Sequence, residues 1–417
     1  MPLLPFLLTA GLAAAYTPLS DSSLRKSSLF TSDTSSTFST SSSSLDSLLA
    51  PILVPRVPGT PGHAAVQSHF ISFFQQKLHK DWILEWHNST SLTPATGKTQ
   101  VPFSNLILRR DPPRTKSRPG DVSRLTLAAH YDSLYRPEGF IGAVDSAVPC
   151  ALLLHTLESI DAALTKKWET TGDAGDGLED EEKGVQVVLF DGEEAWVQWT
   201  DEDSLYGSRA LADHWEKKYP PGSGTTHSTP LEAISLFLLL DLLGAADPTV
   251  QSFFEATHWA YQNMATVEAR LRSAGLLETT PKKPFLFDSK KNAFNHGGYI
   301  QDDHVPFLQK GVNEILHIIP SPFPKVWHTM DDNGENLDGK TVRDWGRILN
   351  GFVAEWMDLE GFLELGEEKQ KGSETSAAAR RMVVPGFCFV QSLLSMRSMV
   401  GRGESGGGNG ECSSVFM

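Results

Sequence analysis

Apolar and polar residues follow two different periods along this chain, and the periods predict which segments are helices and which are strands. Apolar residues recur every three or four positions over residues 64–78 and 343–359, which is typical of one face of a helix. Short, nearly continuous apolar runs rich in strand-forming residues lie between them. These runs are residues 124–130, 185–190, 234–241 and 314–319.

Helical or loop patterns separate the four runs; residues 148–164, for example, read VPCALLLHTLESIDAAL. Strands that alternate with helices predict an α/β fold: a single globular domain with a central, mostly parallel or mixed sheet flanked by helices. In such sheets, ligands bind beyond the carboxyl ends of the strands. The residues that follow the four runs are therefore the first candidates for function.

Composition divides the 417 residues into four parts. Residues 1–15 are apolar and end in small residues, which predicts a signal peptide and a place in the secretory pathway or outside the cell. The Ser- and Thr-rich residues 16–47 predict a flexible segment, and residues 366–417 predict a disordered, low-complexity tail. The globular domain is expected over residues 48–365. The glycosylation acceptor NST at residues 88–90 fits the secretory route.

Charge and cysteine content exclude several classes of protein. The formal net charge is −15 and no basic stripe offsets it, so a nucleic-acid partner is not expected. The N-terminal apolar stretch is too short to cross a bilayer, and we expect no membrane span. Three cysteines do not make a disulfide scaffold. Cys150 is the only cysteine in the predicted core. Separately, we expect the protein to be a monomer.

Each predicted strand leads to a side chain that can bind a metal ion. The set comprises His130, Asp145, Glu193, Glu194, Asp241 and His328. Zinc binds His nitrogen and carboxylate oxygen, and a catalytic site keeps one position open beside three protein ligands. A metal ion would explain two adjacent glutamates, because one can bind the ion while the other moves protons. The alternative is that the pair begins a helix, where acidic side chains favour the dipole.

Several motifs resemble a known family of enzymes. HYDS (130–133), GAVDSAVPCALLL (142–154), FDGEEA (190–195) and WHTMDDN (327–333) resemble the zinc aminopeptidase-like family, peptidase family M28 of clan MH. A narrower resemblance, to the glutaminyl-peptide cyclotransferases (glutaminyl cyclases), rests on four further stretches. They are DSLYGSRALA (203–212), LLLDLLGAADPT (238–249), IQDDHVPFLQKGV (300–312) and IPSPFPKVWHTMDDNGENLD (319–338).

The resemblance implies a role for individual residues. It implies a single zinc ion bound by Asp145, Glu194 and His328, with Glu193 as the general acid and base. Asp241 and Asp302 match a pair of hydrogen-bonded carboxyl groups near Glu193 that belong to the catalytic set. The residues that match the substrate pocket are Trp199, Gln301, Phe323 and Trp327. The family often has a cysteine before the HYDS histidine, paired with the equivalent of Cys150; here Ala129 stands there, so Cys150 is expected to be a buried free thiol.

The resemblance implies an acyltransferase that cyclises N-terminal glutaminyl residues of peptides and proteins, and glutamyl residues more weakly, to pyroglutamate. The main alternative is a two-zinc aminopeptidase, in which His130 and Asp241 hold a second ion and Glu193 activates water. A second alternative is a binding protein on an inactive enzyme fold. Such proteins lose ligands or the base, whereas this chain keeps the ligand set and Glu193.

Overall fold

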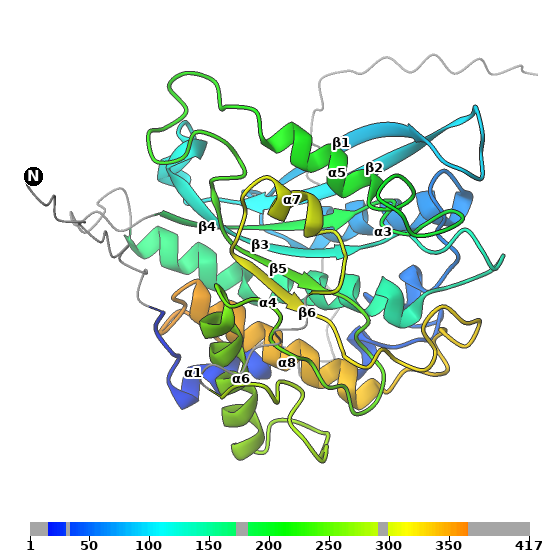
Figure 1. Cartoon of the computed structure of the whole chain (residues 1–417). Coiled ribbons are helices and arrows are strands. Elements are labelled where there is room, and N and C mark those ends of the chain that lie inside the picture. The colour runs from blue at the N-terminus through cyan, green and yellow to red at the C-terminus, as the bar shows by residue number, and fades with distance from the viewer. Residues whose placement is uncertain (1–15, 31–33, 172–181, 291–298, 366–417) are drawn as a thin grey trace, which may run out of the picture. The chain divides into compact units, whose positions relative to one another are not determined.

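The computed structural model describes residues 16–30, 34–171, 182–290 and 299–365 (Figure 1). All of these residues belong to one unit of the chain, Met1–Glu368. The expected signal peptide, residues 1–15, and the expected tail, residues 366–417, lie outside the described residues.

A six-stranded mixed sheet forms the centre of this unit, in the order β1-β2-β4-β3-β5-β6 (Figure 1). The four predicted apolar runs are its parallel strands. These are β3 (Val122–His130), β4 (Glu182–Phe190), β5 (Ile234–Leu240) and β6 (Ile315–Ile318). Two strands that the apolar pattern did not predict, β1 (Ile83–Leu92) and β2 (Gln100–Arg110), extend the sheet antiparallel beside β4. The predicted α/β class and mixed central sheet are confirmed.

The register brings the carboxyl ends of the four parallel strands to one edge. His130 at the end of β3 pairs with Phe190 at the end of β4, and Leu240 of β5 pairs with Ile318 of β6. Because the strands run in the same direction, the segments that follow them all leave the sheet on this side. The segments that carry the candidate residues therefore start from neighbouring positions at this edge, although His130 and His328 are 198 positions apart in the sequence.

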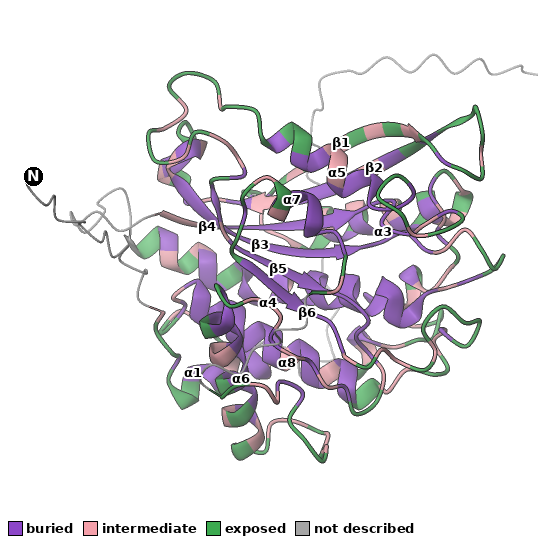
Figure 2. Ribbon diagram, in the orientation of Figure 1, coloured by how far each residue is buried: buried purple, intermediate pink, exposed green. Residues whose placement is uncertain are grey.

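Helices cover both faces of the sheet (Figure 1). Side chains such as Leu125 and Leu127 of β3 join one apolar core, and the next residue, Ala128, joins the other. The first core packs against α3 (Pro61–Lys77), α4 (Val148–Thr171), α6 (His258–Ser273) and α8 (Gly339–Trp356). The second packs against α5 (Tyr206–Trp215) and α7 (Val305–Gln309). Figure 2 shows the result: the inner strands of the sheet are mostly buried, whereas the edge strand β1 is partly exposed.

Shorter helical turns complete the described chain. They are α2 (Thr34–Thr37), the 3-10 turns Ala50–Ile52, Pro113–Thr115 and Pro119–Asp121, and a kinked turn over Ala143–Ala147 that leads into α4.

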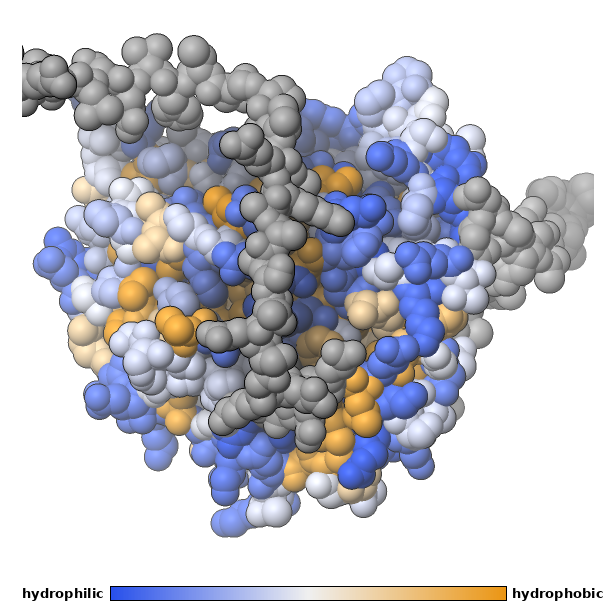
Figure 3. All heavy atoms as spheres, turned by 180° about the vertical axis from the view of Figure 1, so that it is seen from behind, coloured by the Kyte–Doolittle hydropathy of each residue, from blue (hydrophilic) through white to orange (hydrophobic). Residues whose placement is uncertain are grey.

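Among the described residues, a single helix, Ala143–Thr170, has the length and apolar composition to cross a membrane. It covers the kinked turn and all but the last residue of α4, and 89% of its apolar window is buried inside the domain. Such burial is typical of a core helix, since α4 packs against the sheet and against α8. On the surface seen from behind in Figure 3, polar and apolar residues are intermixed.

The Ser- and Thr-rich segment differs from the expected flexible chain wherever it is described. Its first half forms helix α1 (Asp21–Ser28), which packs against α8 and α6. Leu24 is only 2% exposed, and the backbone N–H of Leu19 donates to the Glu355 carboxylate at 3.0 Å. The expectation of flexibility over residues 16–47 is therefore corrected for residues 16–30 and 34–47.

Charged side chains of the domain explain why so polar a segment is ordered. Arg270 donates to the carbonyl oxygen of Leu19 at 2.6 Å and to Asp21 at 2.8 Å. The Ser20 backbone N–H and hydroxyl, and the Ser23 hydroxyl, donate to Glu360 at 2.9 Å. The segment thus gains its order from specific polar contacts around two buried leucines, Leu19 and Leu24, which hydropathy alone does not reveal.

Two leucines of this segment give a matched test of its order. Leu24→Ala removes side-chain atoms from a buried site, so we expect the free energy of unfolding to fall by about 2 kcal/mol or more. Leu45 is 99% exposed, and we expect Leu45→Ala to change it by less than about 0.5 kcal/mol. Guanidinium chloride unfolding followed by circular dichroism measures both. Equal effects of the two substitutions would contradict the docking of α1.

Candidate active site

A tight turn at the end of β4 presents the two adjacent glutamates. Gly192 has a φ of +75°, and a Cβ atom there would lie 2.3 Å from the Phe103 ring, so only glycine fits. The preceding Asp191 is a scaffold residue, since its carboxylate accepts from Ser104 N at 2.6 Å and lies 2.9 Å from His63 Nε2. Glu193 and Glu194 do not begin a helix, so the helix-start alternative is excluded.

One buried carboxylate fixes the backbone of both glutamates. Asp132, just after β3, accepts from Glu193 N at 3.1 Å through one oxygen and from Glu194 N at 3.2 Å through the other. Burial opposes its ionisation, but the hydrogen bonds from His130 and these two amides hold the pKa of Asp132 below its usual value. The backbone that carries the two glutamate side chains is therefore fixed by hydrogen bonds at both amides.

Arg56 fixes the loop that carries Asp145. Its fully buried guanidinium donates to the carbonyl oxygens of Tyr131 at 2.6 Å, Gly142 at 2.9 Å and Asp145 at 3.2 Å, and also to that of Ile141. Five donors in a rigid fork allow one arginine to hold several carbonyl groups at once. The loop between β3 and α4 is thus anchored from the inside.

The Asp145, Glu194 and His328 side chains meet beyond the strand ends. Their ligand atoms all lie within 4.8 Å of one another. His328 Nε2 is 3.4 Å from Asp145 Oδ2 and 3.7 Å from Glu194 Oε2. The backbone of His328 has a φ of +54°, which is uncommon for a residue with a side chain and is often found at functional sites.

The geometry of these three residues suits a zinc ion. Ligands about 2.1 Å from a tetrahedral ion lie about 3.4 Å apart, close to the separations observed here. Glu194 Oε1 is buried and has no hydrogen-bond partner, and burial followed by the charge of Asp145 raises the pKa of Glu194 well above its usual value. A cation would supply the partner that this carboxylate lacks. The residues therefore fit a metal ion chemically as well as geometrically.

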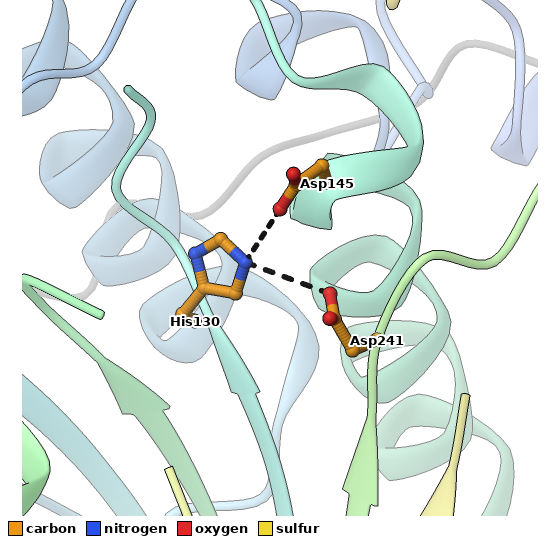
Figure 4. Close-up of side chains that lie close together, drawn as sticks. All are labelled: His130, Asp145 and Asp241. Carbon is orange, nitrogen blue, oxygen red and sulfur yellow. Dashed lines mark hydrogen bonds and ion pairs between the residues drawn. The ribbon is translucent and has the colours of Figure 1, made fainter. Parts of the chain in front are cut away.

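A second cluster shares one residue with the first. Figure 4 shows His130 at the end of β3 facing Asp145 and Asp241, with its Nε2 atom 2.9 Å from Asp145 Oδ1 and 3.6 Å from Asp241 Oδ1. The three ligand atoms lie within 4.8 Å of one another. Asp241 also accepts a hydrogen bond from the Ser146 hydroxyl and one from Leu242 N at 2.8 Å. Asp241 therefore has protein donors, which Glu194 Oε1 lacks.

The two further catalytic candidates have separate partners. Asp302 lies 2.8 Å from His317 Nε2 and accepts from Asp303 N at 2.6 Å. Among the described hydrogen bonds, none joins Asp302 to Asp241. The structure therefore corrects the expectation of a direct hydrogen bond between these two carboxyl groups. Their charges still interact, because burial and then the charge of Asp241 raise the pKa of Asp302 well above its usual value.

A cavity of about 650 Å³ opens over the first cluster. All four predicted pocket residues line it, together with the three metal-ligand candidates, Glu193 and Asp241. The Trp327 ring stacks on His328 with 3.9 Å between ring centroids, and Phe323 packs edge-on against Trp327. Trp199 Nε1 donates to Gln301 Oε1 at 2.9 Å. The cavity thus has a carboxylate-rich floor and aromatic walls, a combination suited to a small polar group on an apolar chain.

Sequence reasoning assigned no role to Arg56, Asp132 or His63, which hold the site in place. Asp132 falls inside the quoted motif HYDS but reads there as a turn residue. Arg56 lies in PRVPG, where nothing in the sequence shows that its partners are carbonyl groups 75 or more residues away. The Asp191–His63 contact joins residues 128 positions apart. These roles arise from long-range contacts rather than from local patterns.

Comparisons with known proteins agree on one family. Residues 109–353 match the sequence model of Peptidase family M28. The chain is 41% identical over 312 residues to a glutaminyl-peptide cyclotransferase of Bos taurus, covering 74% of this chain and 80% of the relative. It is 40% identical over 310 residues to a glutaminyl-peptide cyclotransferase-like protein of the same species, covering 74% of this chain and 73% of the relative.

Solved structures give the same result. The glutaminyl cyclase of Macrostomum lignano superposes with a TM-score of 0.66 at 29% identity, covering 84% of this chain and 97% of that one. The Porphyromonas gingivalis glutaminyl cyclase superposes with a TM-score of 0.53 at 20% identity, covering 79% of this chain and 99% of that one, and supports the fold alone.

The structure confirms the expected state of Cys150 and predicts its reactivity. Cys150 is a buried free thiol that donates to the His130 carbonyl oxygen at 3.0 Å, and burial raises its pKa to about 12. We expect iodoacetamide at pH 8 to alkylate Cys150 at least about 100-fold more slowly in the folded protein than in guanidinium chloride. Peptide mass spectrometry measures this. Equal rates in the two states, or a disulfide at Cys150, would contradict the assignment.

Proposed function

This chain belongs to peptidase family M28 and, within it, to the glutaminyl-peptide cyclotransferases, and on that premise we propose that it is a zinc-dependent glutaminyl cyclase. It converts N-terminal glutaminyl residues of peptides and proteins to pyroglutamate with release of ammonia, and acts on glutamyl residues more weakly. The observation that carries the proposal is the three-ligand cluster of Asp145, Glu194 and His328 on the floor of a cavity with aromatic walls.

The reaction needs no water. The α-amine of the substrate attacks the side-chain carboxamide carbon, a carbon–nitrogen bond forms in a five-membered lactam, and the bond to the departing nitrogen breaks. The amine loses one proton and the leaving nitrogen gains one, so ammonia departs. A zinc ion held by Asp145, Glu194 and His328 would polarise the carboxamide oxygen as a Lewis acid.

Glu193 is positioned to carry the proton. It lines the cavity beside the ligand cluster, and burial, followed by the charges of Glu194 and Asp302, raises its pKa well above the usual value. A carboxyl group whose pKa approaches the working pH can both accept a proton from the amine and deliver one to the leaving nitrogen. Asp302, with its own pKa raised, is the nearby acid suited to donating a hydrogen bond.

The aromatic residues would position the substrate and exclude water. Trp327 and Phe323 form one apolar wall, and Trp199 is oriented by its hydrogen bond to Gln301. Flat walls suit the two methylene groups of a glutaminyl side chain. Exclusion of bulk water favours attack by the amine over hydrolysis.

The second cluster keeps a two-zinc aminopeptidase as the alternative. His130, Asp145 and Asp241 are close enough to share a further ion (Figure 4). The protein donors that already satisfy Asp241 favour the single-ion reading. One zinc ion per chain supports the cyclase, whereas two ions and release of a free amino acid would support the peptidase.

We also propose that the protein enters the secretory pathway. The apolar residues 1–15 support this, and so does the placement of the only Asn-x-Ser/Thr acceptor in the chain. Asn88 and Thr90 are both exposed on β1, one of the two edge strands of the described sheet. A glycan there would reach solvent and would shield an open strand edge.

Substitutions of the adjacent glutamates separate their proposed roles. We expect Glu194→Gln and His328→Ala to lose zinc and activity together. Glu193→Gln should keep zinc and peptide affinity while kcat falls by about 100-fold or more, because it loses only the group that moves the proton. Metal analysis and the rate of ammonia release from a Gln-initiated peptide measure both properties.

The exposed Glu202 in the same loop supplies the control, and Glu202→Gln should match the unchanged protein. In ¹⁸O-labelled water, the pyroglutamate should carry no label. Loss of zinc by Glu193→Gln with retention by Glu194→Gln would reverse the two roles.

Expression in a eukaryotic secretory host tests the proposed localisation. We expect the protein in the medium, with cleavage close to Ala15 and a gel mobility that changes on treatment with peptide N-glycosidase. Asn88→Gln should remove that change and leave secretion intact. Retention of the intact chain inside the cell would refute secretion, and secretion without a glycan would refute only the use of Asn88.

A further inference from the structure

The cavity has one cationic side chain among many carboxylates. Arg136 is the only lysine or arginine among the described residues that line it, whereas Asp145, Glu193, Glu194 and Asp241 supply four carboxyl groups. The Arg136 side chain is 62% exposed, whereas the four acidic residues are buried. Arg136 therefore lies at the mouth of the cavity and the acidic groups at its floor.

A stack of aromatic rings supports Arg136. Its guanidinium carbon lies 4.8 Å from the Tyr135 ring centroid, and the Tyr135 ring stacks on Trp196 with centroids 4.8 Å apart. Trp196 is only 7% exposed, and its backbone N–H donates to Asp203 at 2.9 Å. The guanidinium thus rests on a rigid surface, which reduces the entropy lost when it binds a ligand.

The ion pair that Arg136 makes in the structure is weak. Glu138 Oε2 lies 3.6 Å from Arg136 Nη1, and the Glu138 side chain is 92% exposed. An ion pair between two exposed side chains contributes little and can exchange readily. Both residues belong to the loop between β3 and α4, which extends beyond the strand ends (Figure 1). A carboxylate of a bound peptide could replace Glu138 there.

We propose that Arg136 is a subsite for a carboxylate of the substrate, namely an Asp or Glu side chain in the second or third residue. This inference rests on the proposed function, in which the N-terminal glutaminyl side chain occupies the floor of the cavity. The following residues must then leave through the mouth, where Arg136 lies. The carboxyl groups of the floor disfavour acidic peptides, and Arg136 offsets that repulsion at the point where the peptide emerges.

Peptides with amidated C-termini test the subsite. We compare Gln-Glu-Phe-Ala-amide with its neutral isostere Gln-Gln-Phe-Ala-amide, and each with its glutamate or glutamine moved to the third position. In Arg136→Ala, kcat/KM for the acidic peptides should fall about two- to five-fold, through KM with kcat unchanged, because an exposed ion pair supplies uniform binding. The neutral peptides should be unaffected. High salt should reduce the difference in the unchanged protein.

Two further variants sharpen the comparison. Arg136→Glu should reverse the preference and favour a peptide with lysine in place of glutamate. Arg118 is similarly exposed, at 56%, pairs with Asp121 and does not line the cavity, so Arg118→Ala should leave every peptide unchanged. A free C-terminus offers the same chemistry. An Arg136-dependent gain with Gln-Ala but not with Gln-Ala-amide would identify the terminal carboxylate as its source.

The outcomes distinguish this inference from the function on which it rests. If the unchanged protein fails to cyclise the neutral peptides, the proposed function is wrong and the subsite falls with it. If the protein cyclises acidic and neutral peptides equally, with or without Arg136, the cyclase stands and the subsite is wrong. Equal losses for both peptides in Arg136→Ala would also overturn the subsite.

Discussion

The crowding of buried carboxyl groups at one edge of the sheet is the constraint on which the rest of this molecule depends. An ionised carboxylate without partners costs several kcal/mol in a protein interior, so each group needs a donor or a cation. Asp132 receives two backbone amides, and Asp191 receives an amide and His63. Glu194 keeps one oxygen without a protein donor. Asp303 and Asp332 also have buried oxygens without a partner, but among the described residues only Glu194 of these three belongs to a cluster of possible metal ligands, which marks it as the carboxylate suited to an ion.

This division also explains why two glutamates stand side by side. A single carboxylate, that of Asp132, holds both of their amides, and Gly192 allows the turn that delivers them. Because this backbone is fixed, Glu193 and Glu194 can take different roles, proton transfer and metal binding, without a second loop to position one of them. Arg56 does the same for the loop of Asp145, so two of the three candidate ligands, Asp145 and Glu194, lie on backbone that is fixed by hydrogen bonds.

The sequence predicted the parts of this structure that rest on local pattern or on short motifs. The four parallel strands and the helices α3, α4 and α8 followed from apolar periodicity, because their buried faces are nearly uninterrupted. Strands β1 and β2 were not predicted from the sequence, because polar residues alternate through the partly exposed β1 and Pro102 interrupts the apolar pattern of β2. The order of α1 and the anchoring by Arg56 could not be predicted, because their partners lie far away in sequence.

The docking of the N-terminal segment has a consequence for synthesis of the protein. The Leu19–Glu355 hydrogen bond joins residues 336 positions apart. Ribosomes add about 5–20 residues per second, so roughly 20–70 s pass between the appearance of these two partners. During that time Leu24 has no α8 to pack against. The first helix of the domain must therefore be among the last elements to find its place, and the nascent chain carries it unpaired until its own C-terminal helix emerges.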